Sequence, residues 1–223
     1  VICGNGAAEV IFTLCHAVKP KRALIPAPTF AEYGQALAST GCELEYYMLT
    51  ENDGFVLSEA YLDILHKGLD MAFLCNPNNP TGMLIPHRLL KRILEKCRKL
   101  DILLVVDECF LDFVKEPEEY SLKHSLSGFN NLFILKAFTK RYAMAGVRLG
   151  YGLCSDRKLM ERMELCVQPW NVSTMAQAAG LQALTETEYV EEGRQLVFRE
   201  AQWLKDELVR IGYKVFPSEA NYI

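Results

Sequence analysis

The sequence lacks an excess of basic residues and contains no long apolar run. Its 24 Lys and Arg residues are outnumbered by 28 Asp and Glu residues, so the formal net charge is −4 at pH 7. A chain without a basic excess has no long-range attraction for a nucleic-acid backbone. Apolar runs such as Ile102–Val106 and Leu132–Leu135 are far shorter than the roughly 20 residues that a membrane-spanning helix needs. We therefore expect neither nucleic acid nor a membrane as a partner.

Paired cysteines are also lacking. None of the eight cysteines belongs to a Cys-x-x-Cys pair, the spacing typical of redox and zinc motifs. Most of them lie in apolar segments, where cysteine behaves as a small hydrophobic residue. We expect reduced thiols, no metal site and a cytoplasmic protein, because disulfides are rare in that compartment. The cysteines are Cys3, Cys15, Cys42, Cys75, Cys97, Cys109, Cys154 and Cys166.

The two ends of the sequence lack the features of a complete chain. Val1–Gly4 belongs to an apolar segment and has neither an initiator methionine nor a signal peptide. Ala220–Ile223 has the pattern of a strand that is only beginning. We therefore expect a piece of a longer protein. Between its ends the sequence contains no repeat and no low-complexity tract.

The sequence does contain a regular alternation of strand-like and helical segments. Half of its residues are hydrophobic, which is enough for one large core. Short apolar runs predict strands at Arg22–Ile25, Glu43–Met48, Met71–Cys75, Ile102–Val106 and Leu132–Leu135. Helical spacing of apolar residues predicts helices at Ala7–Val18, Ala31–Thr40, Leu57–Lys67 and His87–Leu100. This alternation is typical of an α/β fold with a parallel sheet.

The pattern changes after Trp170. Two helical segments follow each other directly, Ser173–Thr185 and Glu188–Ile211, and the second has charges along its whole length. A long charged helix is consistent with a connector that leaves the large domain. We therefore predict an incomplete large domain over residues 1–187. Residues 188–223 would form the connector and the beginning of a small second domain.

Polar residues with possible chemical roles follow the predicted strands. In open α/β sheets, ligands bind beyond the carboxyl ends of the strands. Asn76–Gly82 follows one strand and Asp107 ends another, while Lys140 comes shortly after a third. Arg148 lies eight residues beyond Lys140. Each residue alone has an ordinary explanation as a turn, a helix cap or a solvated cation, but their order and spacing together favour a functional site.

A further motif, Gly4-Asn5-Gly6, directly precedes the first predicted helix. A helix N-terminus offers backbone N–H groups to a phosphate. A dinucleotide-binding site is disfavoured here, because the motif lacks the third glycine and the acidic residue about 20 positions further on.

Taken together, these motifs resemble the large domain of the class I and II aminotransferases, pyridoxal-phosphate enzymes with the aspartate aminotransferase fold. The similarity extends from Gly4-Asn5-Gly6 through Thr29–Gly34 and Asn76–Gly82 to Pro169–Val172. Within this family it is closest to threonine-phosphate decarboxylase and histidinol-phosphate aminotransferase. The resemblance implies a mostly parallel central sheet with helices on both faces, followed by the start of a small C-terminal domain. It also implies a homodimer.

The resemblance further implies pyridoxal 5′-phosphate as the cofactor and a role for each residue around it. Lys140 would hold the cofactor covalently and move protons at the substrate, and Asp107 would keep the ring nitrogen protonated. Asn79 would hydrogen-bond the ring 3-oxygen, and Phe30 would stack on the ring. The phosphate would lie at the N-terminus of the first helix. The residues expected around it are Gly6, Ala7, Ala8, Thr139 and Arg148.

Phe110 departs from the pattern of most aminotransferases of this branch, which have a tyrosine that donates to the ring 3-oxygen. Threonine-phosphate decarboxylases resemble this sequence in having phenylalanine there, and we expect Phe110 to contact the cofactor. Ala8 and Ala137 are further departures, at positions where relatives have polar side chains near the phosphate. Each lost hydroxyl weakens cofactor binding by about 0.5–1.5 kcal/mol, a loss that Arg148 and the helix amides can offset.

Three functions remain open from the sequence. The first is decarboxylation of a phosphorylated amino acid, above all L-threonine O-3-phosphate, in cobalamin biosynthesis. The second is amino transfer, as in histidinol-phosphate aminotransferase, and the third is a sensor domain that binds the cofactor without turnover. The two reactions differ in which bond at the substrate α-carbon stands perpendicular to the cofactor ring. By the resemblance, the arginine that binds the substrate carboxylate lies outside this chain.

Overall fold

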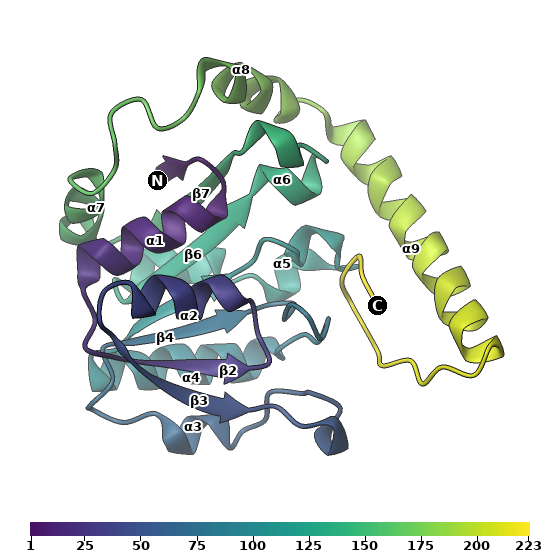
Figure 1. Ribbon diagram of the computed structural model, residues 1–223, viewed down its shortest axis with the longest axis horizontal. Helices are drawn as coiled ribbons and strands as arrows, with labels where there is room; N and C mark the ends of the chain where they lie inside the picture. Colours follow the sequence, from purple (N-terminus) through teal and green to yellow (C-terminus); the bar gives the residue numbers. More distant parts are fainter.

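The centre of the protein is a single seven-stranded sheet (Figure 1). The computed structural model describes all residues, 1–223. The strands are β1 (Ile2–Gly4), β2 (Arg22–Ala27), β3 (Glu43–Met48), β4 (Met71–Cys75), β5 (Leu103–Asp107), β6 (Leu132–Ala137) and β7 (Gly150–Cys154). Their order across the sheet is β1-β7-β6-β5-β4-β2-β3. Neighbours among β2 to β6 are parallel, and β7 is antiparallel to both β1 and β6. The predicted fold class, an α/β fold with a mostly parallel sheet, is confirmed.

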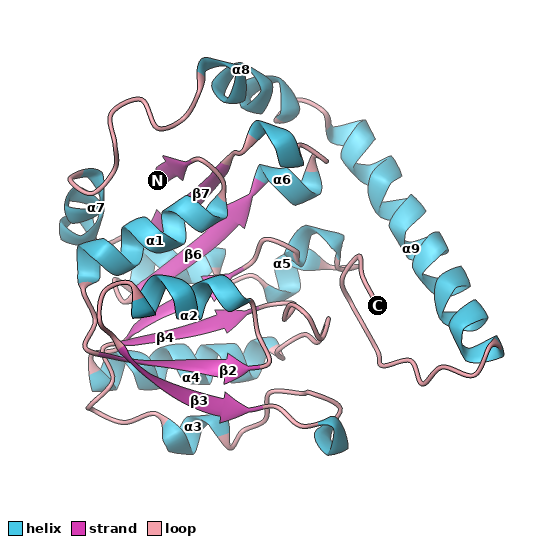
Figure 2. Ribbon diagram, viewed as in Figure 1, coloured by secondary structure: helices cyan, strands magenta, loops and turns pink.

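Helices cover both faces of this sheet (Figure 2). One face packs against α1 (Ala7–Val18), α2 (Ala31–Ala38) and α7 (Arg157–Glu164). The other face packs against α3 (Tyr61–Ile64) and α4 (His87–Leu100). Side chains alternate between the two cores along each strand, so that Val105 belongs to the first core and Leu104 and Val106 to the second. A strand that is buried on both faces needs a continuous apolar run, which is the pattern of β4, β5 and β6.

Short helices lie in the connections that follow β3, β5 and β6. They are η1 (Glu51–Asp53), η2 (Leu111–Phe113), α5 (Pro117–Tyr120), η3 (Lys123–Gly128), α6 (Phe138–Arg141) and η4 (Ala145–Val147). Two longer helices follow β7 and α7, namely α8 (Thr174–Ala183) and α9 (Thr187–Arg210). Of the α9 side chains only Val190 is buried, and the helix extends away from the sheet (Figure 1). The division of the chain at residues 187 and 188 stays a prediction.

The helix predicted over Leu57–Lys67 is wrong in its extent, because only Tyr61–Ile64 is helical. Leu65 leaves the helix with an extended backbone and is buried in the core on the α4 side. After it, the His66 Nδ1 accepts a hydrogen bond of 3.0 Å from the backbone N–H of Gly68. This local hydrogen bond replaces the helical hydrogen bonds that the periodicity predicts.

The strand expected to begin at Ala220–Ile223 is also absent. The segment instead folds back against the turn after β4 (Figure 1). The backbone N–H of Glu219 donates to the carbonyl of Gly82 at 2.9 Å, and the Tyr222 hydroxyl donates to the carbonyl of Asn78 at 3.0 Å. The end of the chain therefore contacts the carboxyl side of the sheet.

All eight cysteines are free, as predicted, and five of them are buried.

No helix combines the length and the apolar character that crossing a membrane would require.

Candidate active site

A cavity of about 110 Å³ opens at the carboxyl ends of β4, β5 and β6. Nine of the ten residues predicted to contact the cofactor line it, and the tenth, Gly6, lies directly beside Arg148. The nine are Ala7, Ala8, Phe30, Asn79, Asp107, Phe110, Thr139, Lys140 and Arg148. Cys75, Cys109 and Ala137 complete the lining. The structure therefore brings together residues from distant parts of the sequence, as the rule for open α/β sheets predicts.

Asp107 is the buried carboxylate of this cavity. It ends β5, in register with Cys75 of β4 and Leu135 of β6. One carboxylate oxygen, Oδ2, accepts a hydrogen bond of 2.6 Å from the Tyr33 hydroxyl, and Oδ1 accepts one of 2.9 Å from the backbone N–H of Cys109. Burial, reinforced by the negative charge of Asp107, raises the pKa of Tyr33 well above its usual value. Tyr33 is therefore a neutral donor at physiological pH, and Asp107 is fixed by two donors.

The aromatic wall of the cavity is held in place by the same tyrosine. The Tyr33 ring stacks on Phe73 of β4, with 5.0 Å between the ring centroids. Phe30 packs edge-on against Tyr33 at 5.5 Å and faces the cavity from the start of α2. Because these rings pack as a row, the position of Phe30 is coupled to that of Asp107.

Lys140 provides the free amine. It lies in α6, three residues after the end of β6, and its exposed side chain has no hydrogen bond and no ion pair. The Lys140 Nζ lies 5.0 Å from the centroid of the Phe110 ring. The other lysine of this segment, Lys136, is largely buried and its Nζ lies 3.3 Å from Glu108 Oε2. Burial lowers the pKa of Lys136, but attraction to Glu108 and then Asp112 outweighs this, so the pKa lies above its usual value and the group stays charged.

The N-terminus of α1 and Arg148 form the cationic end of the cavity. No side chain caps α1, so its first N–H groups are open to a ligand. A side chain at Gly6 would be strained because φ is 88°, and its Cβ would lie 2.6 Å from the Arg148 Nη2, which would have to move. Gly150 permits an equally close approach, since its Cβ would lie 2.3 Å from the backbone nitrogen of Ala7. This crowding places a guanidinium beside uncapped helix amides, an arrangement that suits a phosphate dianion.

The asparagine-rich turn after β4 is built by its own side chains. Asn78 Nδ2 donates to the carbonyl of Pro28 at 3.1 Å and to the Thr81 Oγ1 at 2.9 Å. Its Oδ1 accepts from the Thr29 hydroxyl at 2.8 Å. These bonds tie the turn to the residues that precede α2, and the following Asn79 lines the cavity. Asn78 therefore has a structural role in this turn, whereas the side chain of Asn79 is available to a ligand.

Tyr33 and Tyr222 are the contacts that the sequence did not indicate. Tyr222 packs edge-on against Phe110, with ring centroids 5.0 Å apart, and burial raises the pKa of its hydroxyl. Tyr33 belongs to the Thr29–Gly34 motif but had no predicted role, and no spacing or motif links Tyr222 to the site. The positions of Cys75 and Cys109 could have been predicted, because they lie at or just beyond the carboxyl ends of strands, where ligands bind in open α/β sheets.

The lining of this cavity fits pyridoxal 5′-phosphate. A buried carboxylate suits a protonated pyridine nitrogen, an unpaired lysine suits an aldehyde, and the arginine at the helix N-terminus suits a phosphate. The model of the aminotransferase class I and II family matches residues 1–223. The chain therefore belongs to this family of pyridoxal-phosphate-dependent enzymes.

Individual relatives agree with this assignment. A threonine-phosphate decarboxylase from Salmonella typhimurium is 40% identical over 231 aligned residues, which cover 100% of this chain and 61% of that protein. The crystal structure of the histidinol-phosphate aminotransferase from Clostridium acetobutylicum superposes with a TM-score of 0.90 at 28% identity, covering 98% of this chain and 65% of the other. An aspartate aminotransferase from Thermus thermophilus has the same fold, with a TM-score of 0.87 at 23% identity over 98% of this chain and 59% of the other. The chain thus spans less than two thirds of each of these relatives.

Proposed function

We propose that this protein is a pyridoxal-phosphate-dependent decarboxylase whose substrate is a phosphorylated amino acid, L-threonine O-3-phosphate, with a place in cobalamin biosynthesis. Support comes from the 40% identity to a threonine-phosphate decarboxylase across the whole chain. The single observation that favours decarboxylation within the site is the position of Phe110 on the cavity wall beside Lys140. We further propose a homodimer, as the family resemblance implies, and a cytoplasmic location, which the free cysteines favour.

Phe110 matters because it brings no hydroxyl to the cavity. The adjacent tyrosine does not replace it, since the Tyr222 hydroxyl donates to the carbonyl of Asn78. Asn79 is then the side chain of this wall that donates to the ring 3-oxygen. An aminotransferase must cycle its cofactor through the amine form and benefits from fine control of the cofactor charge, whereas a decarboxylase needs only the electron sink. One such hydrogen bond is worth about 1 kcal/mol.

Each polar group of the cavity has its own role in the proposed reaction. Bound pyridoxal phosphate supplies an electron sink for the bond that breaks at the substrate α-carbon. Asp107 maintains a proton on the ring nitrogen, and its two hydrogen-bond donors keep the carboxylate in one orientation. Lys140 Nζ would hold the cofactor until the substrate amine displaces it, and the freed ammonium group would then be placed to give a proton to the α-carbon that loses CO₂. Arg148 and the amides of Ala7 and Ala8 neutralise the phosphate.

Amino transfer is the alternative function, and the structural likeness to a histidinol-phosphate aminotransferase favours it. Lys140, Asp107 and Arg148 have the same proposed roles in both reactions, so within the cavity only Phe110 bears on the choice between them. A cofactor-binding sensor without turnover is a lesser alternative. The complete set of Asp107, Lys140 and Arg148 around one cavity weighs against it.

The test is an assay of the intact protein with L-threonine O-3-phosphate and, separately, with histidinol phosphate. We expect CO₂ release from the first compound and no 2-oxoglutarate-dependent amino transfer from either. Lys140→Ala serves as the control and should abolish the release. Amino transfer without CO₂ release would establish the alternative function, and cofactor binding without either reaction would establish the sensor.

The role of Phe110 has its own measurement. A tyrosine hydroxyl at this position would donate to the ring 3-oxygen and stabilise its ionised form. Phe110→Tyr should therefore shift the pH titration of the cofactor's visible absorption to lower pH, without a change in substrate preference. Tyr222→Phe is the matched control, because it removes a hydroxyl that is bonded elsewhere, and it should leave the titration in place. An unmoved titration in Phe110→Tyr would remove this residue from the argument for decarboxylation.

A further inference from the structure

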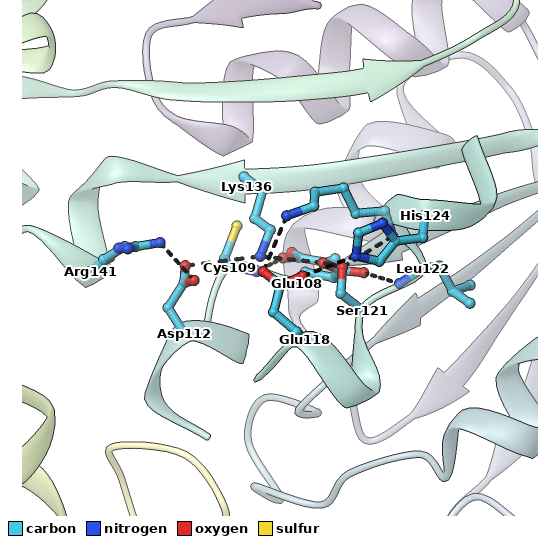
Figure 3. Close-up of polar contacts among 11 residues, drawn as sticks. Glu108, Cys109, Asp112, Glu118, Ser121, Leu122, His124, Lys136 and Arg141 are labelled. Atoms are coloured by element: carbon cyan, nitrogen blue, oxygen red, sulfur yellow. Dashed lines mark hydrogen bonds and ion pairs between the residues drawn. The ribbon is translucent and has the colours of Figure 1, made fainter. Parts of the chain in front are cut away.

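Four charged side chains form a connected network next to the cavity, which we call the charge network: Glu108, Asp112, Lys136 and Arg141 (Figure 3). The Lys136 Nζ lies 3.3 Å from Glu108 Oε2 and 3.9 Å from Asp112 Oδ2. Arg141 Nη1 donates to Asp112 Oδ1 at 3.0 Å. Lys136 and Glu108 are the most buried members, with 12% and 0% of their side chains exposed.

Further hydrogen bonds fix the carboxylate of Glu108. Its Oε2 accepts from the Ser121 hydroxyl at 2.8 Å, and its Oε1 accepts from the backbone N–H of Leu122 at 2.9 Å. Figure 3 shows these donors converging on Glu108 from the segment after α5, opposite Lys136. Because both oxygens have partners, this buried carboxylate has a single defined position.

The charge network lies on the opposite face of the sheet from the cavity. The backbone N–H of Glu108 donates to the carbonyl of Leu135 at 3.0 Å, so the extended pairing of β5 and β6 continues past Asp107. Consecutive residues of an extended chain point to opposite faces, which sends Asp107 to the cavity and Glu108 away from it. By the same alternation Lys136 lies on the same face of β6 as Ile134, which belongs to the core that packs against α4.

The network connects the two segments that bear the chemistry. Glu108 and Asp112 belong to the segment that follows Asp107 and includes Phe110. Lys136 and Arg141 flank Lys140, four residues before it and one residue after it. Three charge pairs therefore join the segment that contains Asp107 to the segment that contains Lys140, from behind the cavity.

Stability does not explain this arrangement. Removing two ions from water costs several kcal/mol each, so a buried ion pair contributes little net stability compared with apolar side chains of similar volume. The property that such a pair can supply is a unique arrangement of the groups that bear it, because an unpaired buried ion is strongly unfavourable. Here the groups so arranged are the ends of β5 and β6.

We propose that the charge network sets the position of Lys140 relative to Asp107, so that Lys136 and Arg141 are positioning residues of the site; this inference rests on the proposed function. Lys136 does not touch the cavity contents, and its effect passes through β6 and α6. Breaking the network loosens the amine while it leaves the phosphate end, formed by α1 and Arg148, unchanged. Covalent capture of an aldehyde by Lys140 should suffer more than binding of the same ring and phosphate without the aldehyde.

Two ligands separate these effects in the intact protein. Pyridoxal 5′-phosphate has the aldehyde that Lys140 captures, whereas pyridoxamine 5′-phosphate has the same ring and phosphate without it. For Lys136→Met we expect the dissociation constant of pyridoxal phosphate to rise about tenfold or more, and that of pyridoxamine phosphate about threefold at most. Lys136→Arg, which keeps the charge, should restore both constants. The visible absorption of the bound cofactor should move in Lys136→Met and return in Lys136→Arg.

A matched control is available in the same region. Lys123 pairs with Glu118 at 3.1 Å and has no ion pair with Glu108 or Asp112, so Lys123→Met should leave both dissociation constants unchanged. If Lys136→Met does not fold, Arg141→Met takes its place, because the Arg141 side chain is 39% exposed and its loss breaks a single ion pair, the one with Asp112. An equal rise in the two dissociation constants, or no rise in either, would overturn the inference. If the unaltered protein binds neither ligand, the proposed function itself fails and the inference with it.

Discussion

At the residue scale, two lysines four positions apart on the same stretch of chain have opposite environments. Lys140 is exposed and has no polar partner, so its amine is available for a covalent bond. Lys136 is buried against Glu108, and its raised pKa keeps it as an ammonium ion, which is not nucleophilic. The difference arises because Lys136 lies within β6, on the face of Glu108, whereas Lys140 lies beyond the strand, in α6.

This contrast makes a direct prediction for the loaded protein. Reduction with borohydride, followed by peptide mass mapping, should place the pyridoxyl group on Lys140. Lys140→Ala should give no adduct, while Lys136→Arg should still give one at Lys140. A pyridoxyl group on Lys136 would contradict the assignment and would also remove Lys136 from the charge network.

At the element scale, close backbone approach shapes the phosphate end of the site. β7 begins at Gly150, directly against the first residue of α1, and β7 is the antiparallel strand between β1 and β6. A Cβ at Gly150 would lie 2.3 Å from the Ala7 nitrogen and 2.7 Å from the Gly6 carbonyl carbon, and both are backbone atoms that cannot turn aside. The N-terminus of α1 therefore depends on a residue that is distant in sequence.

Gly150→Ala should consequently disturb both stability and the site. We expect the free energy of unfolding to fall by about 1–3 kcal/mol, as for other insertions into packed regions. The affinity for pyridoxal 5′-phosphate should fall as well, because α1 must shift from its position beside Arg148. Gly146→Ala is the control: a Cβ there would meet nothing within 4 Å, so neither the urea midpoint nor the affinity should change. Equal effects of the two substitutions would contradict this account.

The elements also show what the sequence could predict. The bounds of α1, β3, β4 and α4 were predicted to the residue, because each has a clear apolar pattern, periodic in the helices and continuous in β4, and a distinct end. The extent of the helix at Leu57–Lys67 was predicted wrongly, because burial of Leu65 overrides local periodicity.

The candidate site was also predicted in part. The residues that were predicted from motifs and from their positions at strand ends line one cavity. Tyr33 and Tyr222 escaped prediction, because their contacts depend on packing between elements that no local pattern encodes.

At the scale of the whole molecule, the sheet separates two apolar cores, and each contains a buried thiol with no ion pair. Cys15 of α1 lies in one core and Cys97 of α4 in the other. Burial raises the pKa of each thiol to about 12, from an ordinary value of 9.0. Cys15 is raised further by the nearby Cys42, and the Cys97 pKa is lowered slightly by Lys96. Both cores therefore hold groups that resist ionisation only while the protein is folded.

This property predicts how stability depends on alkaline pH. Between about pH 9 and pH 12 the unfolded chain has lost these thiol protons and the folded chain still holds them, so the unfolded state binds fewer protons. The free energy of unfolding then falls as pH rises through this window, by up to about 1.4 kcal/mol per pH unit for each thiol. The stabilisation is complete below pH 9, so urea midpoints at pH 7 and pH 8 should agree more closely than those at pH 9 and pH 10. Cys97→Ala should be less stable at every pH because it leaves a cavity, yet its stability should fall less steeply above pH 9, whereas the exposed Cys166→Ala should keep the original slope. An unchanged slope in Cys97→Ala would mean that this thiol ionises within the folded core, against the burial that the structure gives it.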